Sequence, residues 1–220
     1  MPADEAAAGE GALRGLVVGE SEVFDEAEYR AYRLLAGLSA VHYGGAALWS
    51  GGRIEALEGS RTWQRPAGLV FESMAAAHAW HGSPEYRHAH EQRLRGARSS
   101  VWLIEQTGHP APIAPGSGPA PLAYILGEVT AIRDLEPFKE YLRGVAPSLA
   151  AVGGRYLTKG GRIDVIEGPW QPTRAVLIEF PSWEIAAAWY RSDDYQPLAR
   201  LRQGCSDTEL VLLEGVPAKG

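Results

Sequence analysis

The same pattern of residues occurs twice in this chain, and this repeat limits the possible folds more than any other feature. Shifting the sequence by 109 residues brings the two halves into register without a gap between Tyr29 and Glu105. The matching positions include two glycine pairs, a tryptophan and a tyrosine: Gly44-Gly45 with Gly153-Gly154, Gly51-Gly52 with Gly160-Gly161, Trp80 with Trp189, and Tyr86 with Tyr195. An internal repeat of this length predicts two domains of about a hundred residues with the same fold.

The repeat divides the 220 residues into four segments. We expect a disordered tail over 1–13, repeat 1 over 14–106, a Pro- and Gly-rich linker over 107–121, and repeat 2 over 122–216. Cys205 is the only cysteine, which excludes an internal disulfide and suits a reducing compartment. Since the N-terminal segment does not resemble a signal peptide, the expected location is cytoplasmic.

Charge and hydropathy narrow the range of partners. The formal net charge of -6 disfavours nucleic acid and anionic membrane surfaces, both of which select basic proteins. No apolar run approaches the length that spans a bilayer. We therefore expect a small molecule as the partner.

Hydrophobic periodicity and turn residues predict the same order of elements in both repeats. Each has a strand, a helix, two strand segments joined at a glycine pair, another strand, a second helix and a last strand. The predicted ranges in repeat 1 are 16–23, 25–41, 46–50, 53–57, 66–71, a helix from 73 past 86, and 100–104. Those in repeat 2 are 123–132, 134–152, 155–159, 162–166, 174–180, a helix from 182 past 195, and 209–213. This βαββαβ order predicts an α+β fold of the ferredoxin-like plan.

In such a plan both helices cover one face of the sheet, and the other face must also be buried. Two sheets can bury that face against each other, and here the second sheet is on the same chain. The sequence therefore predicts an intrachain pseudo-dimer, an α/β-barrel built from both repeats. A further homodimer of chains stays open, because edge strands can pair.

One stretch of repeat 2 resembles a known family. The run GGRYLTKGGRIDVIEGPWQPTRAVLIEFPSWEIAAAWYRSDDYQ, residues 153–196, is similar to the uncharacterised family labelled domain of unknown function 1330, of the dimeric α/β-barrel superfamily. Repeat 1 keeps Trp80, Tyr86 and both glycine pairs but has Val70 where repeat 2 has Glu179. The resemblance implies the ferredoxin-like fold and sheet-to-sheet pairing, and it implies no particular reaction. The wider superfamily includes cofactor-free monooxygenases, polyketide cyclases, lactone isomerases and haem proteins.

Histidines distinguish the two repeats. Repeat 1 has His78, His81, His88 and His90 where repeat 2 has Ala187, Tyr190, Pro197 and Ala199. In the superfamily the ligand cavity usually lies between helices and sheet, so inward-facing histidines are of interest. Helical periodicity predicts an inward stripe on the first helix that His42 continues, and it places His81 and His90 at the inward edge of the second. A neutral imidazole can act as acid or base near pH 7, so His42 and His81 are the candidate catalytic residues. Structural roles for both, in the core and at the surface, remain the alternative.

Aromatic residues supply candidate substrate contacts. Trp49 and Trp63 occur in repeat 1 alone, and with Tyr32, Tyr43 and His90 they could line an apolar pocket. Simple repacking of the two tryptophans is an equal alternative. A metal or haem site is disfavoured, because no Cys-x-x-Cys or His-Glu-x-x-His pattern occurs and the histidines spread around their helix. Glu179, within an apolar strand, should have a partner or a raised pKa.

The histidine asymmetry and the resemblance together favour an enzyme. We expect a cofactor-free cyclase, isomerase, lyase or oxygenase that modifies a hydrophobic aromatic or polyketide-like metabolite by acid–base chemistry in the repeat 1 cavity. The alternative is a non-catalytic module that binds a small molecule or serves in stress. The sequence leaves the substrate and the reaction open.

Overall fold

The computed structural model describes residues 13–109 and 121–217, and each repeat has the same eight elements. Repeat 1 comprises β1 (Gly15–Val23), α1 (Glu26–His42), β2 (Ala46–Ser50), β3 (Ile54–Glu58), β4 (Ala67–Phe71), α2 (Met74–His81), α3 (Pro84–Arg93) and β5 (Ala97–Glu105). Repeat 2 comprises β6 (Ala123–Ile132), α4 (Leu135–Ala150), β7 (Arg155–Lys159), β8 (Ile163–Glu167), β9 (Ala175–Phe180), α5 (Trp183–Tyr190), α6 (Gln196–Cys205) and β10 (Ser206–Glu214). The predicted tail, apart from Leu13, and most of the predicted linker lie outside the described residues.

Capping side chains start the helices where the sequence predicted. Asp25 accepts hydrogen bonds from two amides in the first turn of α1, and Ser73 accepts one from the first turn of α2. The single second helix predicted for each repeat is wrong, because two shorter helices take its place. In repeat 1 the chain breaks after His81, where Ser83 caps α3 and Pro84 occupies its first turn. Proline has no N–H to continue the preceding helix and suits the start of a new one.

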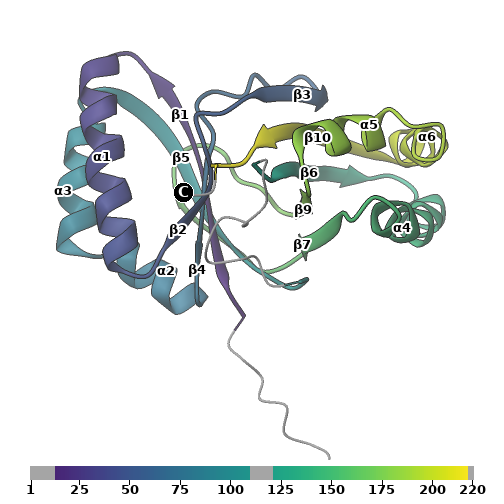
Figure 1. Ribbon diagram of the computed structural model, residues 1–220, viewed down its shortest axis with the longest axis horizontal. Helices are drawn as coiled ribbons and strands as arrows, with labels where there is room; N and C mark the ends of the chain where they lie inside the picture. The colour runs from purple at the N-terminus through teal and green to yellow at the C-terminus, as the bar shows by residue number, and fades with distance from the viewer. Residues whose placement is uncertain (1–12, 110–120, 218–220) are drawn as a thin grey trace, which may run out of the picture.

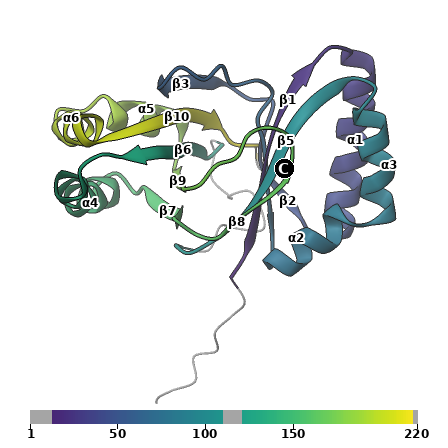
Figure 2. The same cartoon turned by 180° about the vertical axis from the view of Figure 1, so that it is seen from behind.

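The two sheets exchange a strand. Their orders are β2-β4-β1-β5-β8 and β3-β10-β6-β9-β7, with antiparallel neighbours throughout. Strand β3 of repeat 1 therefore lies beside β10 of repeat 2, as Figure 1 shows, and β8 of repeat 2 lies beside β5 of repeat 1 (Figure 2). The two strand segments that the sequence predicted on either side of each glycine pair do form, but they lie in different sheets. The chain passes from one sheet to the other there, with Gly51 and Gly160 at φ 77° and 79°.

Four layers result, with helices on both outer sides and the two sheets between them (Figure 1). The predicted face-to-face packing of the sheets is confirmed by a core that both repeats share. Its aromatic members are Trp49, Trp63, Trp102, Tyr124 and Trp170. A separate apolar core lies between helices and sheet within each repeat. None of the helices in the described ranges is long and apolar enough to cross a membrane.

Candidate functional site

Each repeat contains a cavity between its helices and its sheet. The repeat 1 cavity has a volume of about 370 Å³, and its wall includes Tyr29, Tyr32 and Ala36 from the inward stripe of α1. Leu69 and Val101 contribute from the sheet. The equivalent cavity in repeat 2 has a volume of about 290 Å³. Volumes of this size are near the lower end of known small-molecule pockets, about 300 to 1,000 Å³.

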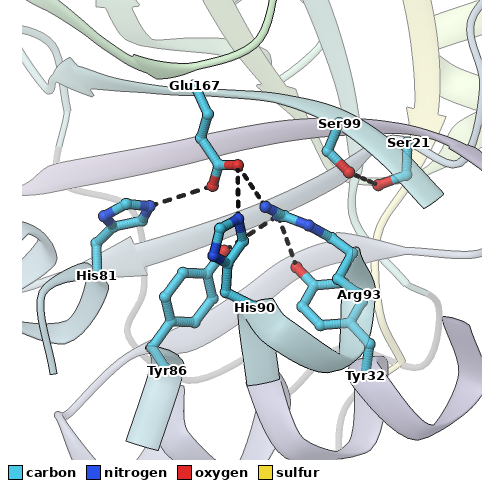
Figure 3. Close-up of polar contacts among 8 residues, drawn as sticks. All are labelled: Ser21, Tyr32, His81, Tyr86, His90, Arg93, Ser99 and Glu167. Atoms are coloured by element: carbon cyan, nitrogen blue, oxygen red, sulfur yellow. Dashed lines mark hydrogen bonds and ion pairs between the residues drawn. The ribbon is translucent and has the colours of Figure 1, made fainter. Parts of the chain in front are cut away.

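A buried arginine links the repeat 1 cavity to a polar cluster beside it. Tyr86, His90 and Arg93 follow one another at helical spacing on α3, so they share one face of the helix. Arg93 is 1% exposed and lines the cavity. Its Nη1 donates to the hydroxyls of Tyr32 at 3.4 Å and Tyr86 at 3.2 Å (Figure 3). Its Nη2 forms an ion pair with Glu167.

Glu167 reaches this cluster because the sheets exchange strands: it is the last residue of β8, from repeat 2. Nε2 of His81 lies 3.2 Å from one of its carboxylate oxygens, and Nε2 of His90 lies 3.4 Å from the other (Figure 3). Burial opposes ionisation, but hydrogen bonds from His81 and Arg93 lower the pKa of Glu167 to about 2. An ionised carboxylate only accepts, so Nε2 of His81 carries the hydrogen in this contact.

His90 is held in its neutral form. Burial and the nearby positive charge of Arg93 lower its pKa below the ordinary histidine value. Arg93 itself stays charged, since Tyr32, Tyr86 and Glu167 raise its pKa against the effect of burial. Near pH 7 the cluster therefore holds one fixed cation, one fixed anion and an imidazole able to accept a proton.

Repeat 2 has the same framework with different side chains around it. Glu58, at the end of β3, lies 2.5 Å from Nη2 of Arg202, and the hydroxyl of Tyr190 donates to the same carboxylate oxygen at 2.7 Å. Tyr190 stands where repeat 1 has His81, and Ala199 stands where it has His90. Among the described residues, only the repeat 1 cluster includes imidazoles.

Comparison with known proteins identifies the family. The family described as Domain of unknown function (DUF1330) matches residues 14–107 and 122–216. The chain belongs to this family. A search of curated proteins gives no match.

Solved structures similar to this DUF1330 chain share its fold at low sequence identity. A "putative monooxygenase" of Fusobacterium nucleatum has 11% identity and a TM-score of 0.59, over 95% of this chain and 96% of that one. Another "putative monooxygenase", from Lactobacillus acidophilus, has 14% identity and a TM-score of 0.53, over 93% and 98%. An "anthrone oxidase-like protein" has 12% identity and a TM-score of 0.54, over 96% and 94%. These likenesses establish the α/β-barrel fold.

The structure brings together three of the residues that the sequence singled out in the DUF1330 chain. Tyr32 lines the cavity, and His81 and His90 contact Glu167. His42 is exposed in the last turn of α1, because the buried stripe ends at Ala40. Its neighbour Tyr43 is half-buried and donates to Glu85 at 3.1 Å, away from the cavity wall.

The two unshared tryptophans lie on the other side of the repeat 1 sheet. A β-bulge between Ala47 and Trp49 shifts the alternation of β2, and the Trp49 ring packs on Tyr124 with ring centroids 5.3 Å apart. Trp63 packs edge-on against Trp170, at 5.4 Å. Both tryptophans thus belong to the core between the sheets.

Sequence reasoning did not select Arg93 or Glu167. Both have matching residues in the other repeat, Arg202 and Glu58, which could have been a signal, but their proximity depends on the strand exchange. Glu179 meets its expectation: burial raises its pKa, and Arg155 pairs with it at 2.6 Å. Among the residues that the structure describes, no group of three or more His, Cys, Asp and Glu side chains is arranged to hold a metal ion.

Proposed function

We propose that this DUF1330 chain is an enzyme that performs acid–base chemistry on a hydrophobic aromatic or polyketide-like metabolite in the repeat 1 cavity, without a bound cofactor. One observation carries this proposal. Two equivalent Arg–Glu pairs support two equivalent cavities, and among the described residues imidazoles surround only the pair beside the repeat 1 cavity. The fold does not need these histidines, because repeat 2 forms the same Arg–Glu pair without them.

Arg93 and Tyr32 are the residues placed to contact the substrate. A buried guanidinium in the wall stabilises an enolate or phenolate oxygen much more strongly than water does. The Tyr32 hydroxyl accepts a hydrogen bond from Arg93, which leaves its own proton free to donate to a substrate oxygen. The indole of Trp80 and the side chains of Leu69 and Val101 supply an apolar wall for the substrate body.

His81 and His90 act next to this pair and do not line the cavity. When an imidazole gains a proton, it competes with Arg93 for the Glu167 carboxylate. Glu167 then neutralises less of the Arg93 charge, and Arg93 stabilises the oxyanion formed on the substrate more strongly. We therefore assign to the two histidines the role of receiving the proton that leaves the substrate, which reaches them through an intervening water because neither imidazole lines the cavity. Proton transfer and oxyanion stabilisation then reinforce each other.

An enolate or phenolate is a common starting point for cyclisation, isomerisation, elimination and oxygenation. The proposal thus names the first chemical step and leaves open which of these reactions follows. The name of one structural neighbour, an "anthrone oxidase-like protein", agrees with an aromatic carbon acid as substrate.

Proton abstraction can be tested apart from the later reaction. The chain is incubated under nitrogen in D₂O with a panel of aromatic carbon acids that starts with anthrone, and loss of the acidic C–H signal is followed by NMR. We expect faster exchange than without protein. The variant His81→Tyr with His90→Ala, which copies the repeat 2 side chains, should fold normally and lose about 10²-fold in rate, a typical contribution of general acid–base catalysis.

The repeat provides matched controls. Tyr32→Phe should lower the exchange rate strongly, whereas Tyr141→Phe at the equivalent position of repeat 2 should leave it unchanged. An unchanged rate in the double histidine variant would remove the histidines from the mechanism. Saturable binding of these compounds with no exchange would instead support the non-catalytic binding module.

A further inference from the structure

We propose that the repeat 2 cavity is a second ligand site, selective for a small aromatic carboxylate. This goes beyond the proposed function, which concerns repeat 1 alone. The cavity of about 290 Å³ lies between α4, α6 and the sheet of repeat 2. Without imidazoles beside its Arg–Glu pair, it is built to hold a ligand without converting it.

A buried arginine with free donors marks the site. Arg202 lines the cavity and is 2% exposed. Its Nη2 is engaged by Glu58, and the hydroxyls of Tyr141 and Tyr195 lie beside the guanidinium. Within the described part of the chain, however, no residue accepts a hydrogen bond from Nε or Nη1. Buried donors without a partner cost free energy, so native structures seldom leave them unmet. Because a guanidinium has five N–H donors, Arg202 can keep Glu58 and still bind a carboxylate.

Two further cations stand at the cavity wall. Lys159 and Arg174 line it, both are exposed, and neither takes part in an ion pair with another described residue. Acidic side chains are missing from the described residues that line this cavity. In a chain with a net charge of -6, this local excess of positive charge favours an anion.

The rest of the wall is apolar, so it should contact an apolar part of the ligand. Helix α4 contributes Phe138 and Leu142 to this wall, and the two strands beside β6 contribute Val176 from β9 and Leu210 from β10. Tyr156 adds a ring where repeat 1 has Ala47, which accounts for part of the smaller volume. An apolar cavity of this size with cations at one side fits a one- or two-ring aromatic acid.

The test uses 2-naphthoate as the probe, with neutral 2-naphthalenemethanol for comparison, and isothermal titration of the full chain. Val176→Trp fills the repeat 2 cavity, and Ala67→Trp fills the repeat 1 cavity at the equivalent position. We expect Val176→Trp to remove one naphthoate site that Ala67→Trp retains. Binding of the neutral compound at this site should be at least tenfold weaker.

A second variant guards against misfolding of the first. Lys159→Gln with Arg174→Gln changes two exposed side chains and should weaken naphthoate binding at least tenfold, while Arg65→Gln, which matches Arg174 in repeat 1, should not. The proposal is overturned if naphthoate binding is absent, if every site survives Val176→Trp, or if the neutral compound binds equally well. None of these measurements depends on turnover, so a failure of the repeat 1 proposal would be seen separately.

Discussion

At the scale of single residues, Glu167 is the point on which the candidate site depends. Its carboxylate is shared by His81, His90 and Arg93, and it comes from the other repeat. Arg93 is buried, and removing the partner of a buried charge costs about 3 to 5 kcal/mol. The same contact thus fastens β8 to the helices of repeat 1 and holds the guanidinium at the cavity wall.

Glu167→Gln tests this contact through its pH dependence. The pKa of Glu167 falls from an ordinary 4.5 to about 2 in the folded chain, which corresponds to about 3 kcal/mol of stability. Because the folded pKa is the lower one, this stabilisation is complete above about pH 4.5 and is lost as the pH falls towards 2. We expect the variant to lose about this much unfolding free energy at pH 7, measured by urea unfolding, and the gap in unfolding free energy from the unchanged chain to narrow below pH 4.

Glu184→Gln, at an exposed ion pair, is the control, and its unfolding free energy should change little. A gap that is constant with pH would contradict the assignment.

At the scale of elements, the sequence predicted what depends on neighbours along the chain. The apolar periodicity placed the strands and the first helix of each repeat closely, and Asp25 and Ser73 cap helices where the sequence predicted their starts, although the division of each second helix into two was not predicted. The pairing of β3 and β8 with the opposite repeat could not be predicted, because alternation of apolar and polar residues indicates a strand but does not show which strands pair with it. For the same reason the site was predicted in part. Tyr32, His81 and His90 follow from helical periodicity, whereas Glu167 joins them through the exchange alone.

The glycine pair at the entry to β8 gives a prediction at this scale. A Cβ on Gly160 would meet nothing within 4 Å, and only its positive φ of 79° resists substitution. A Cβ on Gly161 would overlap the backbone carbonyl of Glu105, where β8 pairs with β5. Gly160→Ala should therefore cost about 1 to 2 kcal/mol of unfolding free energy. Gly161→Ala should cost about 3 kcal/mol or more, at the upper end for single substitutions. Equal losses in thermal unfolding would show that β8 is not held tightly against β5.

At the scale of the whole molecule, the two repeats depend on each other in two ways. The core between the sheets takes residues from both, and each sheet includes one strand of the other repeat. The buried arginine at each cavity wall also pairs with a carboxylate from the opposite repeat, as Glu167 and Glu58 show. Linking the repeats in one chain allows each cluster to carry different side chains, which two identical subunits could not do.

Repeat 2 expressed alone, as residues 121–217, tests this dependence. In the full chain β10 pairs with β3, and Tyr124, Trp170 and Leu213 are buried in the core between the sheets. The isolated repeat would expose this apolar face and the edge of β10. A second copy can cover both by donating its own β8 to β10, which is the position that β3 occupies in the full chain. We therefore expect a homodimer by native mass spectrometry and sedimentation, with Glu167 of each copy on Arg202 of the other. Glu167→Gln in this fragment should weaken the dimer. A stable, folded monomer would show that the exchange is not required for the fold of a repeat.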